Sequence, residues 1–118
     1  MNAIRVYAPG GPEVLRFEQV DVPSPGPGQA LVKIAASGLN FIDVQYRAGK
    51  YPPPATPFTL GMEGAGTVEA VGTDVSEVTV GDRVAYMMVI GTYAQYAVVP
   101  AARLVRLPPN VALRPRPP

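Results

Sequence analysis

The sequence predicts a mainly β domain, built as a partly open β-barrel of short strands with one or two short helices. The chain has 118 residues, which is the length of one domain with a sizeable core. Its 12 glycines and 15 prolines are too many for long helices and suit short strands joined by turns. Short strand-like segments recur at regular spacing between these turn residues, which is the pattern of a barrel.

Charge and composition exclude several classes of function. A formal net charge of +1 gives no footprint for nucleic acid or for an anionic membrane, although four arginines make the C-terminal end locally basic. No apolar run approaches the length that crosses a bilayer, and the alternating residues 1–7 do not form a signal peptide. We therefore expect a cytoplasmic protein without nucleic-acid or membrane partners.

The chain has neither cysteine nor histidine. It therefore lacks disulfides, thiol nucleophiles and imidazole bases. A zinc site would have only carboxylates, which zinc proteins rarely use alone. The composition predicts no metal site and no catalytic arrangement of Ser-His-Asp or Cys-His type.

Three strands are expected in the first third of the chain. The first covers residues 3–7 and is followed by a strong Pro-Gly-Gly-Pro turn at 9–12. Residues 15–22 alternate imperfectly between apolar and polar, as in a half-buried strand. The Pro-rich segment 23–28 predicts a stiff surface connection. Residues 30–36 predict the next strand.

A short helix is expected after Asn40. Asn40 can cap the helix, and Asp43 lies in the first turn, where a negative charge suits the helix dipole. Gly49 can close the C-terminal end. Phe41 and Val44 give only a narrow apolar face, so we expect one or two turns.

The glycine-rich stretch 61–72 organises the middle of the chain. An extended Pro-rich loop over 51–57 leads into it, and a strand is expected over 67–71. Its glycines enter a strand and lack the Gly-x-Gly-x-x-Gly spacing of a dinucleotide loop between a strand and a helix. We predict a glycine-lined floor with one carboxylate, Glu63, in its middle.

Three more strands follow, at residues 84–88, 94–99 and 104–107. The remainder is rich in proline and has no apolar periodicity, which predicts a disordered or polyproline tail. We expect a domain over 1–108 and a Pro/Arg-rich tail over 109–118.

Several motifs resemble a known family. The combination of Gly-Met-Glu-Gly-Ala-Gly-x-Val-x-x-Val-Gly at 61–72 and Val-Gly-Asp-Arg-Val at 80–84 resembles the catalytic, GroES-like domain of the medium-chain dehydrogenase/reductase superfamily. Gly-Gly-Pro-Glu-Val-Leu at 10–15, Gly-Leu-Asn-Phe-Ile-Asp at 38–43 and Gly-Thr-Tyr-Ala-Gln-Tyr at 91–96 are similar to its zinc-free quinone oxidoreductase (zeta-crystallin-like) branch.

The resemblance implies hydride transfer from NADPH to a small-molecule quinone or enone, with the nicotinamide doing the redox work. Zinc-dependent relatives carry a ligating Cys at the position of Asn40 and a ligating His at the position of Met62, so the resemblance also implies that zinc is absent. Family members continue into an alanine-rich helix and a Rossmann domain, which residues 113–118 do not resemble. We therefore expect a truncated or isolated part that has little activity by itself.

The resemblance also suggests site residues. Those implied are Asn40 and Asp43 as catalytic residues, Asn40, Met62 and Glu63 at the cofactor, and Gln45, Tyr46 and Tyr51 in the substrate pocket. Each has a structural alternative: a helix cap for Asn40, a dipole partner for Asp43, core filling for Met62, a structural carboxylate for Glu63 and a solvated loop for Tyr51. The family often has Tyr at the position of Gln45; here Tyr46 comes one residue later, about 100° around the helix.

A second reading comes from another class of protein. The chain could be a stand-alone GroES-like module that binds a small molecule or a partner without turnover. In a catalytic fragment, the face around Asn40 and Met62 would be exposed and prone to self-association. In a binding module that face would be covered by the tail or by a symmetric partner.

Overall fold

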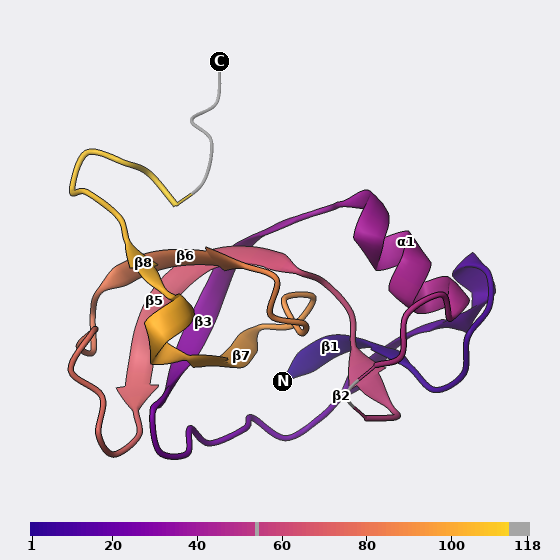
Figure 1. The fold of residues 1–118 in the computed structure, drawn as a ribbon, viewed down its shortest axis with the longest axis horizontal. Coiled ribbons are helices and arrows are strands. Elements are labelled where there is room, and N and C mark those ends of the chain that lie inside the picture. Colours follow the sequence, from indigo (N-terminus) through magenta and orange to yellow (C-terminus); the bar gives the residue numbers. More distant parts are fainter. Residues whose placement is uncertain (54, 114–118) are drawn as a thin grey trace.

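The computed structural model describes residues 1–53 and 55–113, which form two antiparallel sheets and the helix α1 (Phe41–Ala48) (Figure 1). One sheet has the strand order β2-β1-β4, with β1 (Asn2–Val6), β2 (Leu15–Gln19) and β4 (Phe58–Thr59). The other has the order β7-β3-β5-β6-β8, with β3 (Gln29–Gly38), β5 (Glu63–Val71), β6 (Arg83–Met87), β7 (Tyr96–Pro100) and β8 (Val105–Arg106). Short 3-10 turns occur at Pro12–Val14 and Ala101–Arg103.

The five-stranded sheet lies to the left in Figure 1, and the three-stranded sheet and α1 lie to the right. The larger sheet does not close on itself, since β7 and β8 remain at its two edges. The predicted mainly β fold with a partly open barrel and a short helix is therefore confirmed.

Each sheet has its own apolar core. Alternate side chains of the five-stranded sheet point inward and are fully buried, among them Val32, Val68, Val84 and Val99. Burying a valine side chain contributes roughly 1.5–3 kcal/mol, so this cluster is the main stabilising unit of the larger sheet. The second core joins Val6, Phe58 and Leu60 and is covered by Tyr46 of α1 and by Tyr93.

β3 and β5 form the longest pairing in the molecule, and two irregularities bend it. The register shifts between Leu31 and Val32, and again between Ile34 and Ala36. Such bulges increase the local twist of a strand pair. They curve the sheet, and they bring the backbone of β5 unusually close to β3 at Gly66.

The predicted glycine-lined floor is part of a strand, which corrects the expected boundaries. β5 begins at Glu63 and not at Thr67, and β3 continues to Gly38 beyond the expected end at Ala36. Gly38 and Glu63 pair across the two strands. The predicted floor placed Gly64 and Gly66 before the strand, whereas in the structure they lie within it and permit close packing of two paired backbones.

Other boundaries differ more modestly. β2 ends at Gln19, so the expected strand over 15–22 is too long. β6 ends at Met87, because Met88 takes a positive φ of 64°. The two-residue strand β4 was not predicted, since it follows a Pro-rich loop and pairs with β1 through only two positions.

The predicted tail is described only in part, because residues 114–118 lie outside the described residues. Before them, the Arg83 guanidinium donates hydrogen bonds to the carbonyls of Pro108, at 2.8 Å, and Val111. The domain boundary at residue 108 remains a prediction.

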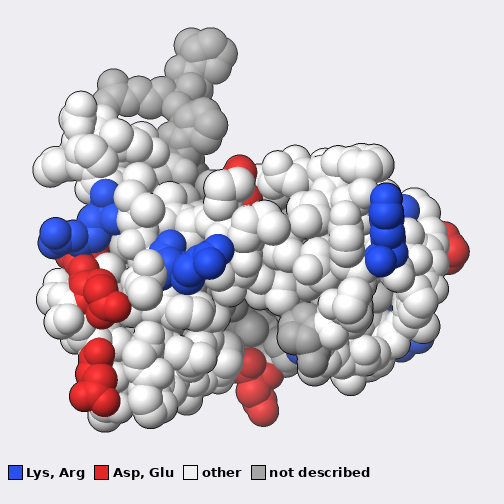
Figure 2. Space-filling model, viewed as in Figure 1, with Lys and Arg blue, Asp and Glu red and all other residues white. Residues whose placement is uncertain are grey.

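The surface carries charges of both signs. In Figure 2 most of the visible face is neutral, and Lys or Arg side chains lie beside Asp or Glu side chains at its left edge. Among the described residues, no helix has the length and apolarity needed to span a bilayer.

A candidate active site at the start of α1

The first turn of α1 is fixed by its own sequence. Asn40 is the N-cap, with extended backbone angles, and its backbone N–H donates to the Asp43 carboxylate at 3.0 Å. This bond is the N3 half of a capping box. At the other end, Gly49 takes the left-handed conformation, at φ 87°, and its N–H bonds back to the last turn. The helix therefore has two turns, within the one or two that were predicted.

Asp43 joins the helix to the loop that follows β6. Only 1% of its surface is exposed, and its Oδ2 also accepts a hydrogen bond from the Tyr93 hydroxyl at 2.7 Å. That hydroxyl lies 3.4 Å from the carbonyl oxygen of Gly38, the last residue of β3. Asp43 Oδ1 is buried without a hydrogen-bond partner among the described residues. The pair of Asp43 and Tyr93 therefore fixes where β3 ends and α1 begins.

Burial raises the pKa of Tyr93 far above its usual value, and the hydrogen bond to Asp43 and the negative charges of Asp43 and Glu63 act in the same direction. The neutral phenol thus remains a donor to Asp43 at physiological pH. Sequence reasoning placed Tyr93 only in a turn. Its presence in the Gly-Thr-Tyr-Ala-Gln-Tyr motif was the available signal.

Two tyrosines, Tyr86 and Tyr93, predict a loss of stability in alkali. Burial also raises the pKa of Tyr86, whereas both phenols titrate near 10.0 when unperturbed. The unfolded chain therefore releases these protons first, and stability that is complete below that pH is lost as pH rises toward the raised folded values. Urea unfolding between about pH 9 and pH 11 should show this decline. Tyr93→Phe should make it shallower, and parallel curves for variant and parent would contradict the assignment.

A shallow groove crosses the sheet beside this pair. Two adjoining hollows of about 400 and 370 Å³ share Glu63, Ala85 and Tyr86. We call this surface the sheet groove; its lining runs from β3 across β5 and β6 to β8 and comprises Ala36, Ser37, Gly38, Glu63, Gly64, Ala65, Ala85, Tyr86, Met87, Arg103 and Val105. Glycine and alanine dominate it on β3 and β5, so little side-chain volume covers the backbone there.

Glu63 occupies the middle of the sheet groove. It is exposed, and its carboxylate lies directly over Gly38, where any added Cβ would overlap it. Among the described residues, none donates a hydrogen bond to this carboxylate. Arg103, one of the four arginines near the C-terminal end, lines the same groove beyond β6.

Apolar side chains are exposed around the sheet groove. Leu39 is 82% exposed and Phe41 74% exposed, next to Gly38 at the start of α1. At the other end, Met87 and Val105 are also largely exposed. Apolar side chains gathered around a groove mark a surface that binds a ligand or a partner.

The predicted site residues fall into two groups. Glu63 pairs with Gly38, and Asn40 and Asp43, joined by a hydrogen bond, follow Gly38 at the start of α1. Tyr46 and Tyr51 lie near the other end of α1, with ring centroids 5.6 Å apart, and line a separate pocket of about 170 Å³ with Pro9 and Phe58. The structure thus does not bring these tyrosines to the Asn40 end of the helix.

Gln45 and Met62 belong to neither group. Gln45 is half-buried on α1, and it lines neither the sheet groove nor the pocket beside Tyr46 and Tyr51. Met62 is only 5% exposed, so its side chain packs inside the molecule. Their assignments to substrate and cofactor remain predictions. Among the described residues, no group of three or more Asp and Glu side chains is placed to hold a metal ion.

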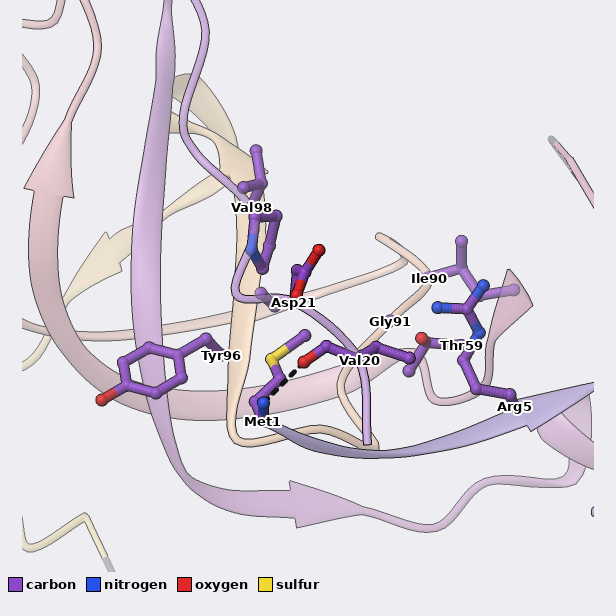
Figure 3. A pocket seen from close by; sticks show the side chains of 11 residues that line it. Met1, Arg5, Val20, Asp21, Thr59, Ile90, Gly91, Tyr96 and Val98 are labelled. Carbon is purple, nitrogen blue, oxygen red and sulfur yellow. Dashed lines mark hydrogen bonds between the residues drawn. The ribbon is translucent and has the colours of Figure 1, made fainter. Parts of the chain in front are cut away.

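A further hollow of about 270 Å³ lies between the two sheets (Figure 3), and no residue of α1 lines it. Arg5 and Thr59 line one side of it, and β7 contributes Tyr96 and Val98 on the other. The Met1 amino group donates to the Val20 carbonyl at 2.6 Å beside it. None of the predicted site residues lines this hollow.

Comparison with known proteins gives consistent matches. The model of the alcohol dehydrogenase GroES-like domain matches residues 26–109. The quinone oxidoreductase of Pseudomonas aeruginosa is 48% identical over 109 residues, which are 92% of this chain and 34% of that protein. A 2-haloacrylate reductase of a Burkholderia species is 39% identical over 113 residues, again 92% of this chain and 34% of that protein.

Among solved structures, Escherichia coli quinone oxidoreductase complexed with NADPH superposes with a TM-score of 0.91. It is 36% identical, and the match covers 96% of this chain and 35% of that one. The chain therefore spans about a third of the length of each protein that it resembles here.

Proposed function

Because the chain belongs to the alcohol dehydrogenase GroES-like domain family, with quinone oxidoreductases among its relatives, we propose that it is the catalytic-domain part of an NADPH-dependent quinone oxidoreductase. Its role is to form one wall of a cleft in which hydride passes from NADPH to a quinone or an enone. The observation that carries this proposal is the sheet groove, which has Glu63 in its middle and ends at Gly38, two residues before Asn40.

The sheet groove fits a flat nicotinamide ring. Ala36, Ala65 and Ala85 place only methyl groups over the backbone of three neighbouring strands, so a planar ring can approach closely beside the Glu63 carboxylate that covers Gly38. When bound, NADPH would supply the hydride. The protein residues then have to hold the ring and the acceptor against each other and exclude water.

Asn40 is suited to orienting the reactants. Its side-chain amide offers both a donor and an acceptor, which match a carboxamide or a carbonyl oxygen. Asp43 acts indirectly, because it is buried and holds the backbone of Asn40 and the Tyr93 hydroxyl. Asp43 is thus a positioning residue, and Asn40 is the residue that touches the reactants.

Glu63 contributes charge. Its exposed carboxylate lies in the groove without a hydrogen-bond donor among the described residues. A nicotinamide ring gains positive charge as it gives up hydride, so a fixed negative charge nearby favours the product side of the transfer. The Burkholderia relative is named as a reductase of 2-haloacrylate, an acid whose C=C bond is conjugated with its carboxyl group. This name supports a wider class of acceptors than quinones.

Asn40 can be tested with two substitutions that differ at the helix cap. Asn40→Ser retains a capping oxygen, whereas Asn40→Ala removes it and should cost about 1 kcal/mol of stability. In NMR titrations of the purified chain with NADPH, we expect shifts near residues 38–43 and 63–65, with a dissociation constant on the order of 1 mM. Both variants should weaken binding roughly tenfold, as expected for one lost hydrogen bond, although only Asn40→Ala is less stable.

The outcomes separate the two readings. Equal binding by Asn40→Ser and the parent chain would remove Asn40 from the site. Micromolar binding with shifts spread well beyond the sheet groove would mean that the chain makes a complete site, as a stand-alone binding module does. Catalytic NADPH oxidation by residues 1–118 alone would contradict the proposed half-site.

A further inference from the structure

β2 presents an open strand edge whose sequence is complementary to itself. We propose that β2 pairs in antiparallel fashion with β2 of a second copy, so that two three-stranded sheets join into one. This proposal is independent of the proposed function and concerns a surface outside the sheet groove.

β2 is the outermost strand of its sheet, and no other strand of the described residues pairs with its free side. Four of its five residues are exposed, and Phe17 is 72% exposed. Uncovered edges of this kind are templates for pairing with another chain.

The hydrogen bonds at the strand ends show which backbone groups are free. Val20 N–H donates to the Met1 carbonyl at 2.8 Å, and the Met1 amino group donates to the Val20 carbonyl. Hydrogen-bonded positions alternate along an antiparallel pair, so Glu18 and Arg16 also direct their backbone groups toward β1. Phe17 and Gln19 therefore direct theirs outward.

The hydrogen bonds of the neighbouring strand β1 agree with this assignment of inward and outward backbone groups. Ile4, which pairs with Phe17, donates its N–H to the Tyr93 carbonyl at 2.8 Å and accepts from Leu60 at 3.1 Å. Both bonds point away from β2. The backbone N–H and C=O of Phe17 and Gln19 are thus available on the outer edge.

A two-fold pairing centred on Phe17 uses these groups and matches the charges. Phe17 then faces the second copy's Phe17 as a hydrogen-bonded pair. Arg16 faces the second copy's Glu18 as a non-hydrogen-bonded pair, in which side chains approach most closely. Opposite charges therefore meet twice, and two exposed aromatic rings become neighbours.

The charges also select this register. Moving one strand by two residues in either direction would place Arg16 opposite Arg16, or Glu18 opposite Glu18, which is destabilising. Tyr7 contacts both charged side chains. Its ring centroid lies 4.8 Å from the Arg16 guanidinium carbon, and its hydroxyl donates a hydrogen bond to Glu18. Both charges therefore stand on the same face of the sheet.

Charge reversal gives the first test, by sedimentation of the purified chain over a concentration series. Arg16→Glu and Glu18→Arg should each weaken self-association roughly tenfold, because each homodimer would then oppose like charges. A mixture of the two variants should associate again, and so should the double variant Arg16→Glu/Glu18→Arg. Glu69→Arg, an exposed change of the same charge on β5, is the control and should leave association unchanged.

A cysteine test reads the register directly, since the chain has no cysteine of its own. Phe17→Cys should form an intermolecular disulfide under mild oxidation, because hydrogen-bonded antiparallel pairs hold their Cα atoms about 5.5 Å apart. Gln19→Cys should not, since its counterpart would lie roughly 13 Å away along the strands. A monomeric parent chain at millimolar concentration, or equal crosslinking of both variants, would overturn the proposal.

Discussion

Replacing Gly66 with alanine should lower the free energy of unfolding by more than about 3 kcal/mol. Gly66 lies on β5 opposite Ile34, beside the irregularity in β3. A Cβ at this position would overlap the Lys33 carbonyl oxygen and lie 2.8 Å from the Lys33 carbonyl carbon. Because these atoms are backbone of the paired strand, they cannot rotate away as a side chain could, and the two longest strands would have to separate.

Gly64→Ala is the matched control. It lies on the same strand and the same face, two residues away, but an added Cβ would meet side-chain methyl and methine groups of Thr92 at 3.1 and 3.3 Å. These groups can shift slightly, so we expect a cost of about 1 kcal/mol. Urea unfolding of both variants measures the difference, and equal costs would show that close approach to Lys33 does not limit residue 66.

This pair of glycines shows why the sequence predicted the strand only from residue 67. A glycine-rich stretch is typical of turns, and its spacing alone does not distinguish a turn from two backbones packed together. The deciding fact is the partner strand, which is some 30 residues away in sequence and whose position depends on the whole sheet. The strands at 3–7 and 30–36 were easier to predict from the sequence, because alternating apolar residues and flanking turn residues define them locally.

The candidate site likewise has features that follow from local sequence and contacts that depend on distant parts of the chain. Asn40 as the N-cap and Asp43 as a first-turn residue follow from local helix signals, and the structure places both there. The contact between Asp43 and Tyr93 does not follow, because it joins residues 50 positions apart. Tyr46 and Tyr51 were grouped with Asn40, but the two turns of α1 place Tyr46 toward the opposite end of the helix.

Asp43→Ala should destabilise the fold by about 3 kcal/mol, because the Asn40 N–H loses its acceptor and the Tyr93 hydroxyl keeps only the Gly38 carbonyl oxygen at 3.4 Å. Tyr93→Phe should cost less, about 1.5 kcal/mol, since Asp43 keeps its bond from Asn40. Tyr96→Phe should be nearly neutral, as no described residue hydrogen-bonds to that hydroxyl. It therefore measures the effect of losing a hydroxyl alone.

The double variant Asp43→Ala/Tyr93→Phe decides whether the two residues act as a pair. Removing both partners together avoids leaving the Tyr93 hydroxyl without its carboxylate acceptor, so the double variant should be at least about 1 kcal/mol more stable than the sum of the single changes predicts. Unfolding in urea gives these free energies, and amide hydrogen exchange at residues 40–43 reports the start of α1. If Asp43 and Tyr93 position Asn40, exchange there should rise in both single variants more than in Tyr96→Phe. Additive free energies with unchanged exchange would instead make the pair a local contact that leaves the reactive end of the helix unaffected.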